Sequence, residues 1–227
     1  MSDQDDHGTD RACVLFSGGL ESAYLLHQVS RDRDVLPAYV RFGFAWEDTE
    51  YEYACDFADE VGAPEPHELR APVEDVYPDF WGFTRDGVPD GSEEGGHYIH
   101  GRNVLLFSKA AVLCTREGVN EIYHGMQPVL SGFPDESYEF RRSMETSLSL
   151  GLDSEIEIRT PLEADTKEEV VGAATEAGVP LKNTFSCIDP TDGEHCGECK
   201  KCKDRHASFV NAGVEDPTVY AVEPPSP

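Results

Sequence analysis

The sequence is poor in basic residues and has no long apolar run. It holds 18 lysines and arginines against 45 aspartates and glutamates, a formal net charge of -27. Because nucleic-acid-binding surfaces are basic, this composition argues against a broad one. A membrane span needs about 20 consecutive apolar residues, and the N-terminus is acidic where a signal peptide is basic and then apolar. We therefore expect a cytoplasmic protein without a membrane partner.

The acidic excess is expected on a folded surface, because the chain keeps periodic apolar segments and does not resemble a disordered protein. Self-repulsion at this charge density opposes compactness in dilute buffer, whereas molar salt screens it within about 3 Å. We infer a halophilic host. A chain of 227 residues suits one domain with a small appended module. Against the acidic background a basic cluster stands out: Lys200, Lys201, Lys203 and Arg205.

Cysteine is sparse outside one short segment. Three cysteines stand singly in apolar contexts that predict small buried side chains: Cys13, Cys55 and Cys114. The other four fall within sixteen residues, at Cys187, Cys196, Cys199 and Cys202. In a cytoplasmic chain such a cluster indicates a metal site rather than disulfides. Four thiolates suit structural zinc, with an iron–sulfur cluster as the alternative, and His195 is expected beside the site rather than in it.

A short apolar run, a glycine pair and a helical pattern follow one another between residues 12 and 22. This order predicts a strand, a tight loop and a helix start. Adjacent glycines leave backbone amides open to a ligand, and the helix start adds unpaired N–H groups and a positive dipole end. We predict a phosphate or pyrophosphate site, with an ordinary strand-to-helix turn as the alternative. Its candidate residues are Phe16, Ser17, Gly18, Gly19, Leu20, Glu21 and Ser22.

Strand and helix patterns alternate along the chain. This alternation predicts an α/β fold with a doubly wound parallel sheet, whose ligands collect at the carboxyl ends of the strands. Expected strands lie near 12–16, 35–42, 67–69, 121–125 and 155–159; expected helices lie near 22–30, 49–61, 104–116, 137–150, 167–177 and 204–212. We divide the chain into a flexible acidic leader (1–10), a main domain (11–180), a four-cysteine segment with a closing helix (181–212) and a loose tail (213–227). Residues 71–100 lack a clear pattern and predict a lid or a surface loop.

Two predicted helices begin with a cation. Arg102 stands at the start of the helix near 104–116, whose apolar residues are expected to form one face: Leu105, Leu106, Ala110 and Leu113. Lys167 stands inside a capping box formed by Thr166 and Glu169. A cation there opposes the helix dipole, so an anion between the cation and the helix start explains its position. A solvated surface lysine is the alternative for Lys167.

Three landmarks, in order, resemble the 7-cyano-7-deazaguanine synthase family of the ATP pyrophosphatase (PP-loop) superfamily. They are the Ser17-Gly18-Gly19 loop, the Gly101-Arg102-Asn103 helix start with Ser131-Gly132-Phe133-Pro134-Asp135, and the four-cysteine tail. The resemblance implies a sheet of the adenine nucleotide alpha-hydrolase type and a small zinc-binding segment. It also implies that ATP and Mg²⁺ activate the carboxylate of 7-carboxy-7-deazaguanine, which ammonia then converts through the amide to the nitrile. Arg102, Lys167 and Asp135 are the candidate catalytic residues, and a homodimer is a candidate assembly.

The chain departs from the family pattern mainly on the substrate side. Glu21 replaces the usual loop aspartate, and Phe44-Ala45-Trp46 stands where the family has Gln-Arg-His. Val129-Leu130 replaces an aspartate and an aromatic residue, and Glu136-Ser137-Tyr138 replaces Cys-Arg-Pro. These departures leave two alternatives open: a paralogue that adenylates a different carboxylate or modifies tRNA or protein, and a catalytically silent binding protein.

Overall fold

A computed structural model describes residues 11–90, 98–127 and 132–227. The predicted leader at 1–10, and the positions Val129, Leu130 and Ser131, lie outside these residues. Among the residues described, no helix is both long enough and apolar enough to cross a bilayer.

The centre of the fold is a five-stranded parallel sheet in the order β3-β2-β1-β4-β5. Its strands are β1 Arg11–Leu15, β2 Asp34–Arg41, β3 His67–Arg70, β4 Glu121–Tyr123 and β5 Glu157–Arg159. The strand order reverses between β1 and β4, and such a switch point opens a crevice at the carboxyl ends of the strands. The α/β, doubly wound prediction is confirmed.

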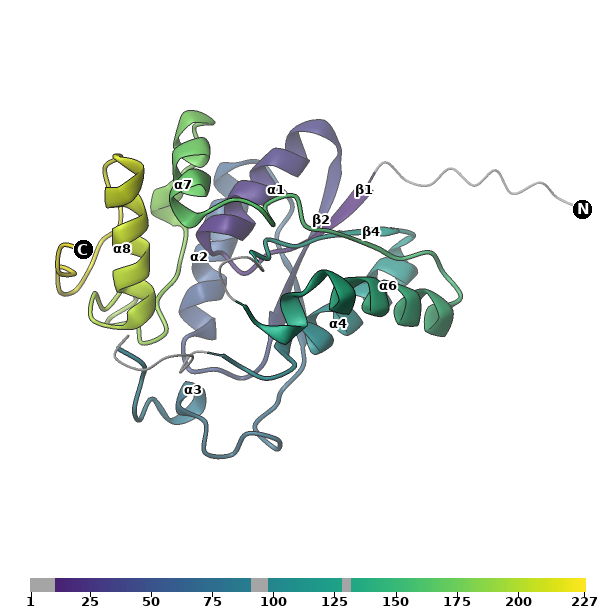
Figure 1. Ribbon diagram of the computed structural model, residues 1–227. Helices are drawn as coiled ribbons and strands as arrows, with labels where there is room; N and C mark the ends of the chain where they lie inside the picture. The colour runs from purple at the N-terminus through teal and green to yellow at the C-terminus, as the bar shows by residue number, and fades with distance from the viewer. Residues whose placement is uncertain (1–10, 91–97, 128–131) are drawn as a thin grey trace, which may run out of the picture.

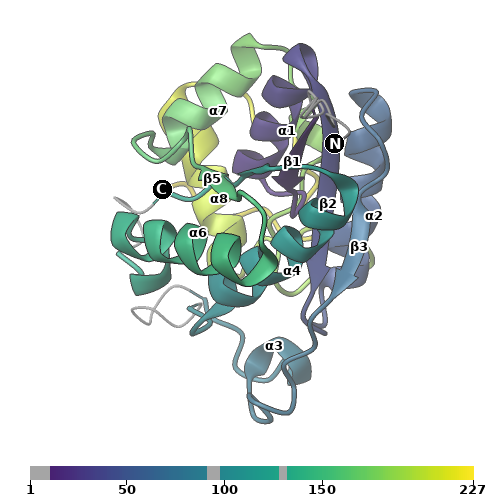
Figure 2. The same cartoon turned by 90° about the vertical axis from the view of Figure 1, so that its right-hand side faces the viewer.

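Helices cover both faces of the sheet (Figures 1 and 2). They are α1 Leu20–Asp32, α2 Glu47–Glu60, α4 Arg102–Glu117, α6 Tyr138–Leu152, α7 Lys167–Glu176 and α8 Lys200–Ala212. In Figure 1, α7 and α8 lie side by side, and α4 and α6 pack together elsewhere in the molecule. The short α3, Trp81–Thr84, lies at the lower end of both views.

Alternation along β1 divides the core into two layers. Ala12 and Val14 pack with residues of α1, α2, α7 and α8, whereas Cys13 and Leu15 face α4. This pattern follows from the two-residue repeat of a strand, which points successive side chains to opposite faces. Because helices cover both faces of the sheet, all four residues are buried. This explains why the sequence of the strand is a continuous apolar run.

Several helix predictions need adjustment at their ends. α8 begins at Lys200 instead of residue 204, because Cys199 in extended conformation takes the N-cap position. Of the four apolar residues predicted to share one face of α4, Leu106, Ala110 and Leu113 are buried. Leu105 is 37% exposed, and Phe107 is fully buried instead. The capping box at the start of α7 is confirmed. Of the three single cysteines, Cys55 is only half-buried.

Residues 71–90 dock onto the molecule at two places. A stack of aromatic rings joins Phe44 to Trp46 at 4.7 Å and Trp46 to Trp81 at 5.5 Å between ring centroids. At the other place, Arg85 Nε donates to the carboxylate of Asp189 at 2.6 Å. The segment therefore connects the end of β2 with the four-cysteine segment.

The C-terminal tail also makes specific contacts. The backbone N–H of Ala221 donates to the carbonyl of His195 at 2.8 Å, and Arg205 Nε donates to Thr218 Oγ1 at 2.7 Å. Tyr220 O–H donates to the Asp216 carboxylate at 2.9 Å. The sequence predicts a loose tail from residue 213, but the contacts of Ala221 and Thr218 pack it against the four-cysteine segment and its closing helix.

Candidate functional site

A cavity of about 570 Å³ opens where the carboxyl ends of β1, β2 and β4 meet. We call it the loop cavity. Six of the seven predicted loop residues line it: Phe16, Ser17, Gly19, Leu20, Glu21 and Ser22. Arg102 and Lys167 line it as well, so the fold brings together two cations that are 65 positions apart in the sequence (167 − 102).

The glycine pair shapes the loop before α1. Gly18 adopts a φ of +76°, and its carbonyl accepts a hydrogen bond from the Phe185 N–H at 2.8 Å. Gly19 is the N-cap of α1 and provides no side-chain hydrogen bond. Apart from the Glu21 N–H, which the Glu21 carboxylate accepts, the first N–H groups of α1 are left to another acceptor, which is the arrangement that binds phosphate at helix starts.

Lys167 and Glu21 form an ion pair at the edge of the loop, with Lys167 Nζ 3.2 Å from Glu21 Oε1. Burial is the largest single influence and favours the neutral acid, but the charge and hydrogen bond of Lys167, a backbone hydrogen bond and the charge of Lys201 together outweigh it and lower the pKa of Glu21. The Glu21 charge in turn raises the pKa of Lys167. Both side chains thus remain ionised at neutral pH, and the departure from the usual aspartate at position 21 keeps a charge beside the loop.

Arg102 begins α4 at the cavity wall. Its Nε is buried and has no hydrogen-bond partner among the described residues. The guanidinium carbon lies 5.8 Å from the centre of the Phe42 ring. A buried donor without a partner lowers the stability of the fold by about 1–3 kcal/mol. The unpaired Nε is therefore consistent with a ligand that accepts its hydrogen bond.

α8 brings two further cations to the cavity, from the basic cluster that stood out in the sequence. Burial and the nearby charge of Lys167 lower the pKa of Lys201 to about 8. Arg205 is 2% exposed, and its Nη2 donates to the Leu181 carbonyl at 3.0 Å. Burial lowers the pKa of Arg205. Desolvated cations of this kind suit a polyanionic ligand.

Asp135 is placed differently from the other candidate catalytic residues. It is buried, and it is not among the described residues that line the loop cavity. Its carboxylate accepts the Asn103 backbone N–H at 3.1 Å and the Tyr98 O–H at 3.2 Å. Asp135 therefore caps the start of α4, where Arg102 stands, and the structure gives it a positioning contact.

Sequence inspection missed several polar residues on the cavity wall. Tyr39 comes from β2, Glu50 from the first turn of α2, and His124 directly follows β4. Burial and the charge of Arg102 lower the pKa of His124 to about 3, so its ring is neutral. The position of Tyr39 and His124 near the carboxyl ends of neighbouring strands was the one signal that could have found them.

The four clustered cysteines form a candidate metal centre. All four are buried, and their Sγ atoms lie within 4.8 Å of one another. The Sγ atoms of Cys187 and Cys199 are 3.9 Å apart, as are those of Cys196 and Cys202. Sulfurs bound at about 2.3 Å around one tetrahedral ion lie about 3.8 Å apart. The residues therefore fit a single bound ion.

Hydrogen bonds within the cluster support the same fit. Cys187 Sγ accepts the N–H groups of Asp189 and Cys196, each at 3.3 Å. Hydrogen bonding among the sulfurs raises the pKa of Cys202 and lowers that of Cys196. His195 lies beside the cluster, where its Nε2 accepts the Ser186 N–H at 3.1 Å.

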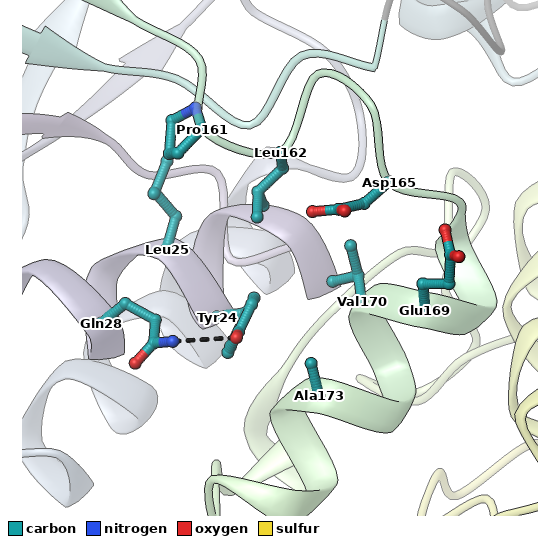
Figure 3. Close-up of a pocket in the computed structure, with 9 residues that line it drawn as sticks. All are labelled: Tyr24, Leu25, Gln28, Pro161, Leu162, Asp165, Glu169, Val170 and Ala173. Atoms are coloured by element: carbon teal, nitrogen blue, oxygen red, sulfur yellow. Dashed lines mark hydrogen bonds between the residues drawn. The ribbon is translucent and has the colours of Figure 1, made fainter.

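A second cavity of about 480 Å³ lies between α1 and α7 (Figure 3). Gln28 Nε2 donates to the Tyr24 hydroxyl at 2.8 Å across one side of it. Its charged lining residues are Asp165 and Glu169, and Glu169 already accepts the Thr166 N–H at 2.7 Å. Two carboxylates repel a triphosphate, so this cavity does not suit a nucleotide.

Comparison with known proteins identifies the family. A family model described as Queuosine biosynthesis protein QueC matches residues 11–213. The 7-cyano-7-deazaguanine synthase of Nitratiruptor sp. is 31% identical over 218 residues, which cover 92% of this chain and 98% of the relative. That of Pelobacter propionicus is 34% identical over 224 residues, with 93% and 98% covered.

A solved structure, the U34-tRNA thiolase NcsA from Methanococcus maripaludis with its [4Fe-4S] cluster, aligns with a TM-score of 0.49 and 14% identity. The alignment covers 83% of this chain and 63% of that one. The family match and the curated relatives together show that the chain belongs to the family of the queuosine biosynthesis protein QueC. The two relatives compared above are 7-cyano-7-deazaguanine synthases.

Proposed function

We propose that the protein uses ATP to convert 7-carboxy-7-deazaguanine and ammonia into 7-cyano-7-deazaguanine, a precursor of queuosine or archaeosine. Family membership supports the product. The observation that carries the use of ATP is the loop cavity, where the uncapped start of α1 meets Arg102, Lys167, Lys201 and Arg205. This combination of amides and cations suits a triphosphate.

The proposed chemistry begins with adenylation. A carboxylate is a poor electrophile until one of its oxygens becomes part of a good leaving group. The substrate oxygen attacks the α-phosphorus of ATP, and pyrophosphate leaves while the amides of Gly19 and the following residues hold it. Arg102 and Lys167 offset the charge that develops on the phosphates. We expect Mg²⁺ to accompany ATP, as it does when phosphates supply most of the metal's ligands.

We propose zinc for the four-cysteine centre. The 3.9 Å spacing of two sulfur pairs supports one tetrahedral ion. A cubane cluster binds each cysteine through a different iron and holds the sulfurs farther apart. The ion supplies structural cross-linking of Cys187 to Cys202, and residues next to these ligands, Ser186, Ile188 and Lys201, line the loop cavity.

A paralogue that activates a different carboxylate is the second candidate. Trp46, which stands in the segment that replaces the family's Gln-Arg-His, lines the loop cavity, and Phe44 packs behind it. An apolar wall in place of polar side chains favours an acid with a less polar edge. A catalytically silent binding protein remains the third hypothesis.

The test is a reaction in molar salt with ATP, Mg²⁺, ammonium and 7-carboxy-7-deazaguanine, followed by mass spectrometry. Formation of the nitrile supports the proposal, and an accumulated amide means that the dehydration step is lost. ATP binding without turnover contradicts the proposed substrate and favours the paralogue. Absence of both ATP binding and turnover favours the silent binding protein. Light scattering of the same preparation tests for a homodimer.

A further inference from the structure

Glu50 places a carboxylate on the wall of the loop cavity, beside the glycine loop. It belongs to the first turn of α2. Its carbonyl oxygen lies 3.3 Å from where a Cβ of Gly18 would be, so this turn packs directly on the loop. The buried Tyr39 donates its O–H to Glu50 Oε2 at 2.6 Å. The side chain is thus held in place on the wall of the cavity in which the proposed reaction takes place.

Glu50 differs from two other carboxylates of the same lining. Glu21 is held in an ion pair with Lys167, and Asp204 in an ion pair with Lys200 at 2.7 Å. Glu50 has no ion pair with a described residue, and its partner is a neutral phenol. A carboxylate held this way can gain and lose a proton without breaking a salt bridge.

The charged and titratable groups around Glu50 come from three elements. Burial is the largest influence and raises the pKa of Glu50 to about 7. The hydrogen bond from Tyr39 and the charges of Arg102 on α4 and Arg41 on β2 act in the opposite direction, while the charge of Glu47 on α2 adds to the increase. Glu50 is therefore divided between its two protonation states near neutral pH, as an efficient proton acceptor should be.

The proposed reaction needs such an acceptor. Ammonia in neutral water is almost entirely ammonium, which has no lone pair with which to attack an acyl carbon. We propose that Glu50 is the base that takes a proton from ammonium in the loop cavity. This inference rests on the proposed function and adds a residue to it.

The step is balanced in protons and electron pairs. One N–H bond of ammonium breaks, its electron pair stays on nitrogen, and the proton moves to the Glu50 carboxylate. The nitrogen then forms a bond to the acyl carbon of the adenylate, and the bond from that carbon to the AMP oxygen breaks with its electrons on AMP. The nitrogen loses one more proton to water as the amide forms, and Glu50 later returns its own proton to water.

Glu50→Gln tests the inference, because the amide keeps the size of the side chain but cannot accept the proton. Glu52→Gln, on the exposed side of α2, is the matched control. With ammonium, we expect Glu50→Gln to form amide about 100-fold more slowly or worse, the scale of a lost general base. Exchange of labelled pyrophosphate into ATP, measured with the acid but without ammonium, should be unchanged. Hydroxylamine, which is largely unprotonated at neutral pH, should restore the rate of product formation.

The outcomes separate this inference from the function on which it rests. Wild-type protein without exchange and without product contradicts the proposed function before any variant is compared. Wild-type activity with ammonium in Glu50→Gln overturns the role of Glu50 alone. Loss of pyrophosphate exchange in Glu50→Gln, or no rescue by hydroxylamine, also overturns it, because Glu50 would then serve adenylation or folding.

Discussion

Replacing Gly18 by alanine should destabilise the protein, whereas a larger change at Gly19 should not. Gly18 has a φ of +76°, a conformation that costs a residue with a Cβ about 1–2 kcal/mol. The new Cβ would also lie 3.3 Å from the Glu50 carbonyl oxygen and 3.4 Å from the Ala54 Cβ, which is tight packing. We therefore expect Gly18→Ala to lower the free energy of unfolding by at least about 1–2 kcal/mol.

Urea unfolding in molar salt, followed by circular dichroism, measures this loss. With a urea m-value of about 2 kcal/mol/M, the midpoint should fall by about 0.5–1 M. Gly19→Val is the comparison, because a Cβ there meets its nearest described atom at 3.5 Å and the backbone is ordinary. Its midpoint should stay close to wild type, while calorimetry shows ATP binding abolished. Equal midpoints for Gly18→Ala and wild type would refute the left-handed loop, and unchanged ATP affinity in Gly19→Val would move the nucleotide elsewhere.

Three further predictions follow from the cap, the metal centre and the ion pair. Thr166→Ala removes the cap that accepts the Glu169 N–H and should cost about 1 kcal/mol in urea unfolding; no loss would contradict the capping box. Cys199→Ser should lose the bound metal and much stability, because metal binding contributes folding free energy. Elemental analysis of wild-type protein should find one zinc per chain and no iron. Stoichiometric iron with sulfide would overturn the zinc assignment. Because the pKa of Glu21 is lowered in the folded protein, the ionised carboxylate stabilises the fold at pH values above the ordinary pKa of a glutamate, and this stabilisation is lost as the pH falls through the lowered pKa. The difference in free energy of unfolding between wild type and Lys167→Met should therefore disappear in acid. A difference that persists in acid would contradict the ion pair.

Some parts of the site lie close together in the sequence, and local patterns predict them. The strand, glycine pair and helix start at residues 12–22 carry their own signals, and so do the short cysteine spacings of the metal segment. The positions of Arg102 and Lys167 at helix starts could be predicted from neighbouring residues. Their meeting in one cavity follows from the parallel strand order, which the alternating pattern also predicted.

Contacts between distant segments could not be predicted in the same way. Glu50 lies on the cavity wall because α2 packs on Gly18 and Tyr39 holds its carboxylate, and no local pattern encodes either contact. The tail appeared loose because proline-rich sequence lacks helical or strand periodicity, although Ala221 pairs with the backbone of His195. Leu105 was misplaced because the helical repeat did not determine which neighbouring position faces the core.

Transfer of oxygen from substrate to AMP tests the central claim, adenylation in the loop cavity, most directly. The substrate is 7-carboxy-7-deazaguanine labelled with ¹⁸O in both carboxylate oxygens, and mass spectrometry measures the ¹⁸O content of the nucleotide products. Adenylation predicts that the AMP released on amide formation carries one ¹⁸O, because the substrate oxygen that attacked phosphorus leaves with AMP. Unlabelled AMP, or label found in inorganic phosphate beside ADP, would contradict the account.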